Sequence, residues 1–166
     1  MPDFDFRYLL LAGLAIALLV AAVTDIRRRQ IDNWLTLGIA AAAPLYWWAS
    51  GMAFMPDIAW QLGLAAITFA VLFGMFALRV MGGGDVKLLT ALALWITPLW
   101  FMQLVIVMSI IGGLLTLAMW INHRARKRQG RLAIPYGVAI ACAGLWALFA
   151  QHRALFHLPA NAAGLG

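Results

Sequence analysis

Long uncharged stretches alternate with short charged ones along the chain, and their lengths predict the architecture. A helix needs roughly 20 apolar residues to cross a membrane, with about 17 as the lower limit. The uncharged stretches that reach this length cover residues 8–24, 33–56, 58–78, 88–122 and 132–151. The pattern predicts an all-α fold, a polytopic bundle of transmembrane helices that forms one domain over residues 1–166.

The stretch 88–122 is too long for one comfortable crossing and barely long enough for two. Lys and Arg collect in cytoplasmic loops, and here they cluster at 27–29, at Arg79 and Lys87, and at 124–131. These clusters share one side of the membrane only if 88–122 crosses twice. Thr97-Pro98 is the expected turn, since proline disfavours helix at the residue before it. We therefore expect about six spans with both termini on the extracytoplasmic side, whereas a five-span alternative would expose the densest basic run outside.

Two of the expected spans are irregular. Pro44 lies inside the second one and predicts a kink there. The fourth one, residues 85–96, covers only about 18 Å of a roughly 30 Å hydrocarbon core. It should therefore thin the bilayer locally or lie inside the bundle.

Composition supports a membrane protein. Of the 166 residues, 65% are hydrophobic and 11% are charged, against about 25% charged in soluble domains. The first apolar stretch precedes its basic cluster, the reverse of a cleaved signal peptide, so we expect it to be retained as a span. The net charge of +6 follows the expected topology, and we predict no nucleic-acid partner.

Metal and cofactor sites are not expected. Cys142 is the one cysteine, which excludes an internal disulfide and a zinc site built from cysteines. Its position in an apolar stretch predicts a small buried residue. His123, His152 and His157 are scattered and show no metal-ligand spacing.

The acidic residues are six aspartates, and three of them fall at the expected cytoplasmic ends of spans. These are Asp25, Asp32 and Asp85. Ionisable residues at a membrane boundary are costly, and this makes them functional candidates. The alternatives are structural: Asp25 would pair with the arginines that follow it, and Asp32 would cap the helix that begins before Trp34.

Asp85 follows three consecutive glycines, Gly82, Gly83 and Gly84. Such a run is expected to break the helix, and it lets backbone or substrate approach closely because there is no Cβ. A plain turn between spans is the alternative. Together with Asp25, Asp85 suggests a dyad in which two close carboxylates share a proton. One then acts as base toward water while the other polarises a carbonyl.

Three segments together resemble the type IV prepilin peptidases, in the family's order and over nearly the whole chain. They are residues 25–36 (DIRRRQIDNWLT), 82–89 (GGGDVKLL) and 134–141 (IPYGVAIA). The second is similar to the Gly-x-Gly-Asp motif of intramembrane aspartic proteases. The sequence departs from the family at Asp32, where a proline is usual. The first cytoplasmic loop is also short and has no cysteine, which implies that the methyltransferase part of larger members is missing or supplied elsewhere. Such short forms resemble the peptidases of tight-adherence (Flp) pili.

The resemblance implies a hydrolase of the bacterial inner membrane. It would cleave the leader peptide from prepilins or pseudopilins at the cytoplasmic face, with Asp25 and Asp85 as the catalytic pair and no cofactor. The residues that would shape the site or bind substrate are Gly82, Gly83, Gly84, Lys87, Asn33, Pro135 and Gly137. The alternative function is a non-enzymatic transporter or pilus-assembly scaffold with functional aspartates. The sequence leaves the substrate's identity and the oligomeric state open.

Overall fold

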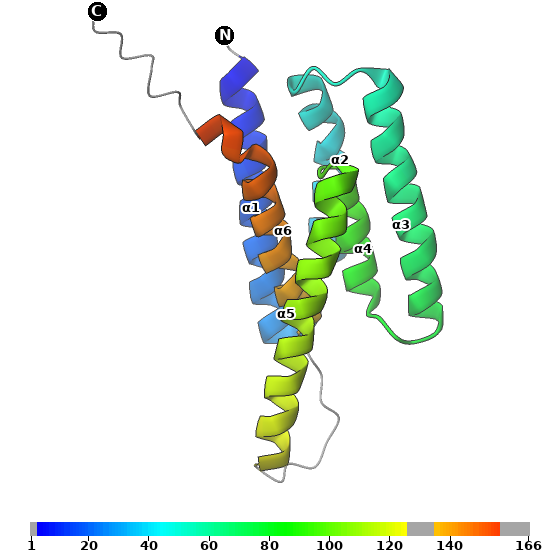
Figure 1. The fold of residues 1–166 in the computed structure, drawn as a ribbon, viewed down its shortest axis with the longest axis vertical. Helices are drawn as coiled ribbons and strands as arrows, with labels where there is room; N and C mark the ends of the chain where they lie inside the picture. The colour runs from blue at the N-terminus through cyan, green and yellow to red at the C-terminus, as the bar shows by residue number, and fades with distance from the viewer. Residues whose placement is uncertain (1–2, 126–134, 157–166) are drawn as a thin grey trace, which may run out of the picture.

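The computed structural model describes residues 3–125 and 135–156, and in this part of the chain every regular element is a helix. The elements are α1 (Asp3–Arg28), α2 (Asn33–Ala49), the short η1 (Phe54–Ile58), α3 (Ala59–Ala77), α4 (Gly83–Ala93), α5 (Pro98–Ala125) and α6 (Tyr136–Phe156). They run up and down as a bundle, and the start of α1 lies at the same end as the end of α6 (Figure 1). The predicted all-α fold is confirmed.

Three helical segments are long and apolar enough to cross a membrane. They are Phe6–Arg28, Phe54–Ala77 and Pro98–Arg124, and Tyr136–His152 is a shorter apolar helix. The chain is therefore a multi-pass membrane protein. Six crossings and an extracytoplasmic location of both termini remain predictions.

The helix boundaries follow the expected turns in most places. The predicted division at Thr97-Pro98 is confirmed, because α4 ends before it and α5 begins at Pro98. The second span lies within the predicted stretch 33–56: α2 ends at Ala49, and Gly51 takes a positive φ of 65° just after the helix. The first part of the predicted span 132–151 and the basic residues 126–131 lie outside the described residues.

Helix α4 is short and lies inside the bundle. It lies between α3 and the other helices (Figure 1), and six of its residues are buried: Val86, Leu88, Leu89, Ala91, Leu92 and Ala93. By contrast, α3 stands at the edge of the bundle and buries only Gln61, Ala65 and Thr68. The fourth span was expected either to thin the bilayer or to lie inside the bundle, and in the structure it lies inside the bundle.

Hydrogen bonds between side chains and backbone groups tie the end of α4 to α2 and α6. The carbonyl of Leu94 accepts a hydrogen bond of 2.8 Å from the indole N–H of Trp47. The indole N–H of Trp95 donates in turn to the carbonyl of Ile39 at 2.9 Å, and the N–H of Thr97 donates to Gln151 at 3.0 Å. Since a bilayer offers no water to free backbone groups, these bonds allow a half-length helix to end within the bundle.

Cys142 is exposed on α6, so the prediction that it is buried is wrong. Its neighbours Ala141 and Ala143 face the core instead. Hydropathy alone does not reveal which side of an apolar helix faces inward, because both sides are apolar in a membrane.

Candidate functional site

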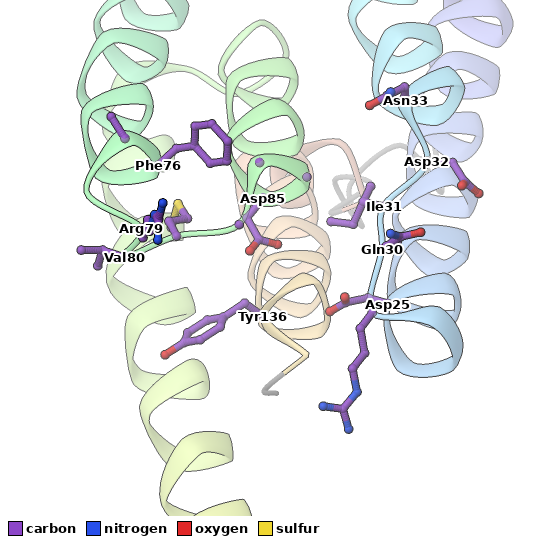
Figure 2. Close-up of a pocket in the computed structure, with 16 residues that line it drawn as sticks. Asp25, Gln30, Ile31, Asp32, Asn33, Phe76, Arg79, Val80, Asp85 and Tyr136 are labelled. Atoms are coloured by element: carbon purple, nitrogen blue, oxygen red, sulfur yellow. The ribbon is translucent and has the colours of Figure 1, made fainter. Parts of the chain in front are cut away.

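One pocket of about 1150 Å³ opens at the end of the bundle where α1 ends and α4 begins. Its walls are the last turn of α1, residues 29–32, the last turn of α3, residues 79–82, and the first turns of α2, α4 and α6. Most of the sequence-predicted site residues line it: Asp25, Asn33, Gly82, Gly83, Gly84 and Asp85. Figure 2 labels Asp25, Asn33 and Asp85 among the residues around this hollow.

Asp25 enters the pocket because α1 continues past the expected span end at residue 24. The helix runs to Arg28, so the loop before α2 consists of residues 29–32. The Asp25 side chain is only 6% exposed, and one of its oxygens accepts a hydrogen bond of 2.7 Å from the N–H of Gly137. That N–H belongs to the first turn of α6, where backbone donors have no partner in their own helix.

Asp85 lies in the first turn of α4 and faces the same pocket. Figure 2 shows the carboxyl groups of Asp25 and Asp85 directed into the space between α1 and α4. The two groups are close enough for the charge of Asp25 to act on Asp85, and the Asp85 carboxyl also accepts a hydrogen bond from the backbone of Gly82. The fold therefore joins carboxylates that are 60 positions apart in the chain.

The predicted break between the preceding helix and Asp85 is present, but it covers residues 78–82 and so lies mostly before the glycine run. Only Gly82 precedes α4, and Gly83 and Gly84 are its first helical residues. None of the three has a positive φ, so close approach is the physical reason for glycine here. A Cβ on Gly83 would lie 3.2 Å from the ring of Phe76, and one on Gly84 would lie 3.2 Å from Ile31. On Gly82 it would lie 2.9 Å from a carboxyl oxygen of Asp85.

Asn33 and Lys87 meet at the edge of the pocket. The Lys87 ammonium donates a hydrogen bond of 2.8 Å to the side-chain carbonyl of Asn33, which ties the start of α2 to α4. Asp32 holds the predicted capping position of α2, but its side chain makes no capping hydrogen bond. In Figure 2 its carboxylate points away from Asp25 and Asp85, so the third acidic group is not directed toward the pair.

Pro135 and Gly137 flank Tyr136, the first residue of α6. A Cβ on Gly137 would lie 2.8 Å from the Asp25 carboxyl oxygen, so only glycine fits against this carboxylate without a shift. Pro135 comes just before the helix and accepts a hydrogen bond from the N–H of Val138 through its carbonyl. The third sequence segment thus holds Asp25 in place.

Sequence reasoning did not assign to the site several residues that line the pocket, among them Arg29, Phe76, Arg79 and Tyr136. Arg29 and Arg79 each follow a helix and adopt positive φ angles of 55° and 59°, which non-glycine residues rarely do. No pattern of residues in the sequence predicts these conformations. Tyr136 lay within the third quoted segment, and its ring packs where a Cβ on Gly112 of α5 would lie 3.0 Å away.

A comparison with protein-family models identifies the family of the chain. The model of the type IV leader peptidase family matches residues 12–117, more than half of the chain. The matched region contains Asp25, Asp85 and the glycine run, and it ends before Pro135 and Gly137. No curated protein and no solved structure matches the chain.

Proposed function

The chain belongs to the type IV leader peptidase family, and we propose that it removes leader peptides from prepilins or pseudopilins with Asp25 and Asp85 as an aspartic dyad. The observation that carries this proposal is the shared pocket: both carboxyl groups line it, and each comes from a different helix. Two carboxyl groups facing one water-accessible hollow are the arrangement that aspartic hydrolysis needs.

In the proposed reaction the two aspartates share one proton, because adjacent carboxylates do not both ionise easily. The ionised member takes a proton from a water molecule, whose oxygen attacks the carbonyl carbon of the scissile peptide bond. The protonated member donates a hydrogen bond to the carbonyl oxygen as negative charge develops there. The C–N bond then breaks, and the leaving amine takes up a proton from the dyad.

The glycine run gives this reaction room. Gly82, Gly83 and Gly84 line the pocket beside Asp85. The substrate peptide must be extended around the scissile bond for that bond to be cut. A wall without side chains allows the substrate backbone to come close to the carboxyl groups.

The pocket end of the bundle is proposed to face the cytoplasm. Exposed cations gather there: Arg27, Arg28, Arg29, Arg79 and Lys87. Cytoplasmic segments are enriched in Lys and Arg, and we therefore propose that the start of α1 and the end of α6 lie on the opposite side. Six crossings follow if α2 and α4 also cross within the bundle.

The test is cleavage of a co-expressed prepilin in bacterial inner-membrane vesicles by the wild type and by Asp25→Asn, Asp85→Asn and Asp32→Asn. Asparagine keeps the size of the side chain and removes its acid–base function. We expect the first two variants to lose cleavage by at least about 10³-fold. Asp32→Asn should cleave within about threefold of the wild type, since its carboxylate points away from the pair.

Normal cleavage by both Asp25→Asn and Asp85→Asn would overturn the dyad. The alternative of a transporter or scaffold would then be tested by ion flux in the same vesicles.

A further inference from the structure

A second hollow lies on the side of the bundle, next to the catalytic pocket. This side groove has a volume of about 360 Å³ and runs between α2, α3 and α4. Its apolar part is lined by Leu37, Ala40, Phe69 and Leu94, and its polar end is formed by Asn33 and Lys87. Asn33 also lines the catalytic pocket, so the two hollows share a wall.

A row of phenylalanines on α3 connects the side groove with the catalytic pocket. Phe69 lines the groove, and its ring stacks on Phe73 with centroids 5.6 Å apart. Phe73 contacts Phe76 at 6.3 Å, and Phe76 lines the pocket. An apolar chain in the groove would thus be guided along aromatic rings to the glycines beside Asp85.

The hydroxyl groups in the side groove already have partners. Thr36 donates to the carbonyl of Asn33 at 3.0 Å, and Thr90 donates to the carbonyl of Val86 at 2.8 Å. At the polar end, Lys87 donates to Asn33. An occupant therefore needs no hydrogen-bonding groups along most of the groove, which suits an apolar helix and not a polar peptide.

The groove opens toward the bilayer. Phe69 and Phe73 are about half exposed on a segment that is long and apolar enough to span a membrane. Since α2 and α3 both pack on the short α4, an entering helix would lie on α4 between them. This gives lateral access from the hydrocarbon region to a site at its boundary.

We propose that the side groove binds the apolar helix of the prepilin on the C-terminal side of the scissile bond. This proposal rests on the proposed function, since it needs a substrate whose cleaved bond adjoins a membrane-embedded helix. Continuity with the catalytic pocket favours this occupant over a lipid chain or a second copy of the protein. Neither a lipid chain nor a second copy of the protein needs a path to the two aspartates.

The first experiment replaces Leu37 with a photo-crosslinking benzoylphenylalanine in full-length protein that carries Asp85→Asn, so that bound prepilin stays uncut. The matched control places the same group at Val71, which is also exposed on the membrane face but does not line the groove. We expect an adduct with the prepilin from position 37, on residues that follow the scissile bond, and about tenfold less from position 71. Equal adducts from both positions, or adducts from position 37 only to lipid or to a second copy, would overturn the proposal.

The second experiment fills the groove with Ala40→Phe and compares it with Val71→Phe. Filling should raise KM for the prepilin about tenfold and leave kcat unchanged, because binding is lost and not chemistry. A fall in kcat alone, or an unchanged KM, contradicts the groove as a substrate site. If the wild type in these vesicles cleaves normally while both groove tests fail, the groove is wrong and the proposed function stands. If the wild type does not cleave the prepilin, the proposed function and the groove proposal both fail.

Discussion

The carboxylate of Asp25 accepts a hydrogen bond of 2.7 Å from the backbone N–H of Gly137, so the end of α1 caps the beginning of α6. The bond is buried and joins residues 112 positions apart. Gly137 therefore positions one carboxyl group of the proposed dyad, and it can do so because it has no side chain. A substitution here would act on the reaction geometry before it acts on the fold.

For Gly137→Ala we expect prepilin cleavage to fall about 100-fold, since a displacement of about 1 Å at a catalytic group has that order of effect. The new Cβ would lie 2.8 Å from the Asp25 carboxyl oxygen and 3.0 Å from its Cβ, so Asp25 must move. Cleavage by vesicles with equal amounts of enzyme measures the effect.

The matched control is Gly63→Ala on α3, where the added Cβ meets nothing within 4 Å. It should cleave like the wild type and unfold at an equal or slightly higher temperature, because alanine favours helix over glycine. A Gly137→Ala enzyme as active as this control would show that Asp25 needs no fixed position.

Gly82→Ala should impair the other carboxyl group. Its Cβ would lie 2.9 Å from an oxygen of Asp85, and the contacted atoms belong to that side chain alone. We therefore expect Asp85 to rotate, with about a tenfold or greater loss of kcat and little change in thermal stability. The comparison is Gly74→Ala, where a Cβ meets nothing within 4 Å. If both variants lose the same fraction of activity, the effect is not specific to Asp85.

Arg79 offers a test of backbone strain. Its φ of 59° is left-handed, a conformation that costs an L-residue about 1–2 kcal/mol and glycine almost nothing. Arg79→Gly should therefore be more stable than Arg79→Ala by about 1 kcal/mol. Both variants lose the same charge, so the difference isolates strain. The free energy of unfolding in mixed micelles measures it.

The same pair of substitutions at Arg27 is the control, because Arg27 lies within the last turn of α1. At this position the alanine variant should have a free energy of unfolding about 1 kcal/mol higher than the glycine variant, because alanine has the higher helix propensity. The same order of stability at both positions would contradict the left-handed conformation of Arg79.

Trp47→Phe should destabilise the bundle by about 1–3 kcal/mol, because it removes the indole donor to the Leu94 carbonyl where α4 ends. Trp48→Phe is the matched control, since Trp48 is 76% exposed and should change the free energy of unfolding by less than about 0.5 kcal/mol. The same measurement in micelles compares both. Similar values for the two variants would mean that the end of α4 does not depend on Trp47.

Much of the fold could be predicted from the sequence because the relevant physics is local. The length of an uncharged stretch determines whether a helix can cross a bilayer, and the bilayer forces each span to satisfy its own backbone. The division at Thr97-Pro98 followed from the backbone of proline in the same way. The motifs around Asp25 and Asp85 likewise indicated the family that the match with residues 12–117 shows.

Only the tertiary structure decided which residues meet. The pairing of Asp25 with Gly137, and of Asn33 with Lys87, joins helices distant in the chain, and their packing faces are hidden in a sequence that is apolar on all sides. For the same reason Cys142 was placed on the wrong side of α6. The role of Gly83 and Gly84 also came from packing: Phe76 and Ile31 fill the space where a Cβ would stand, and α4 begins within the glycine run.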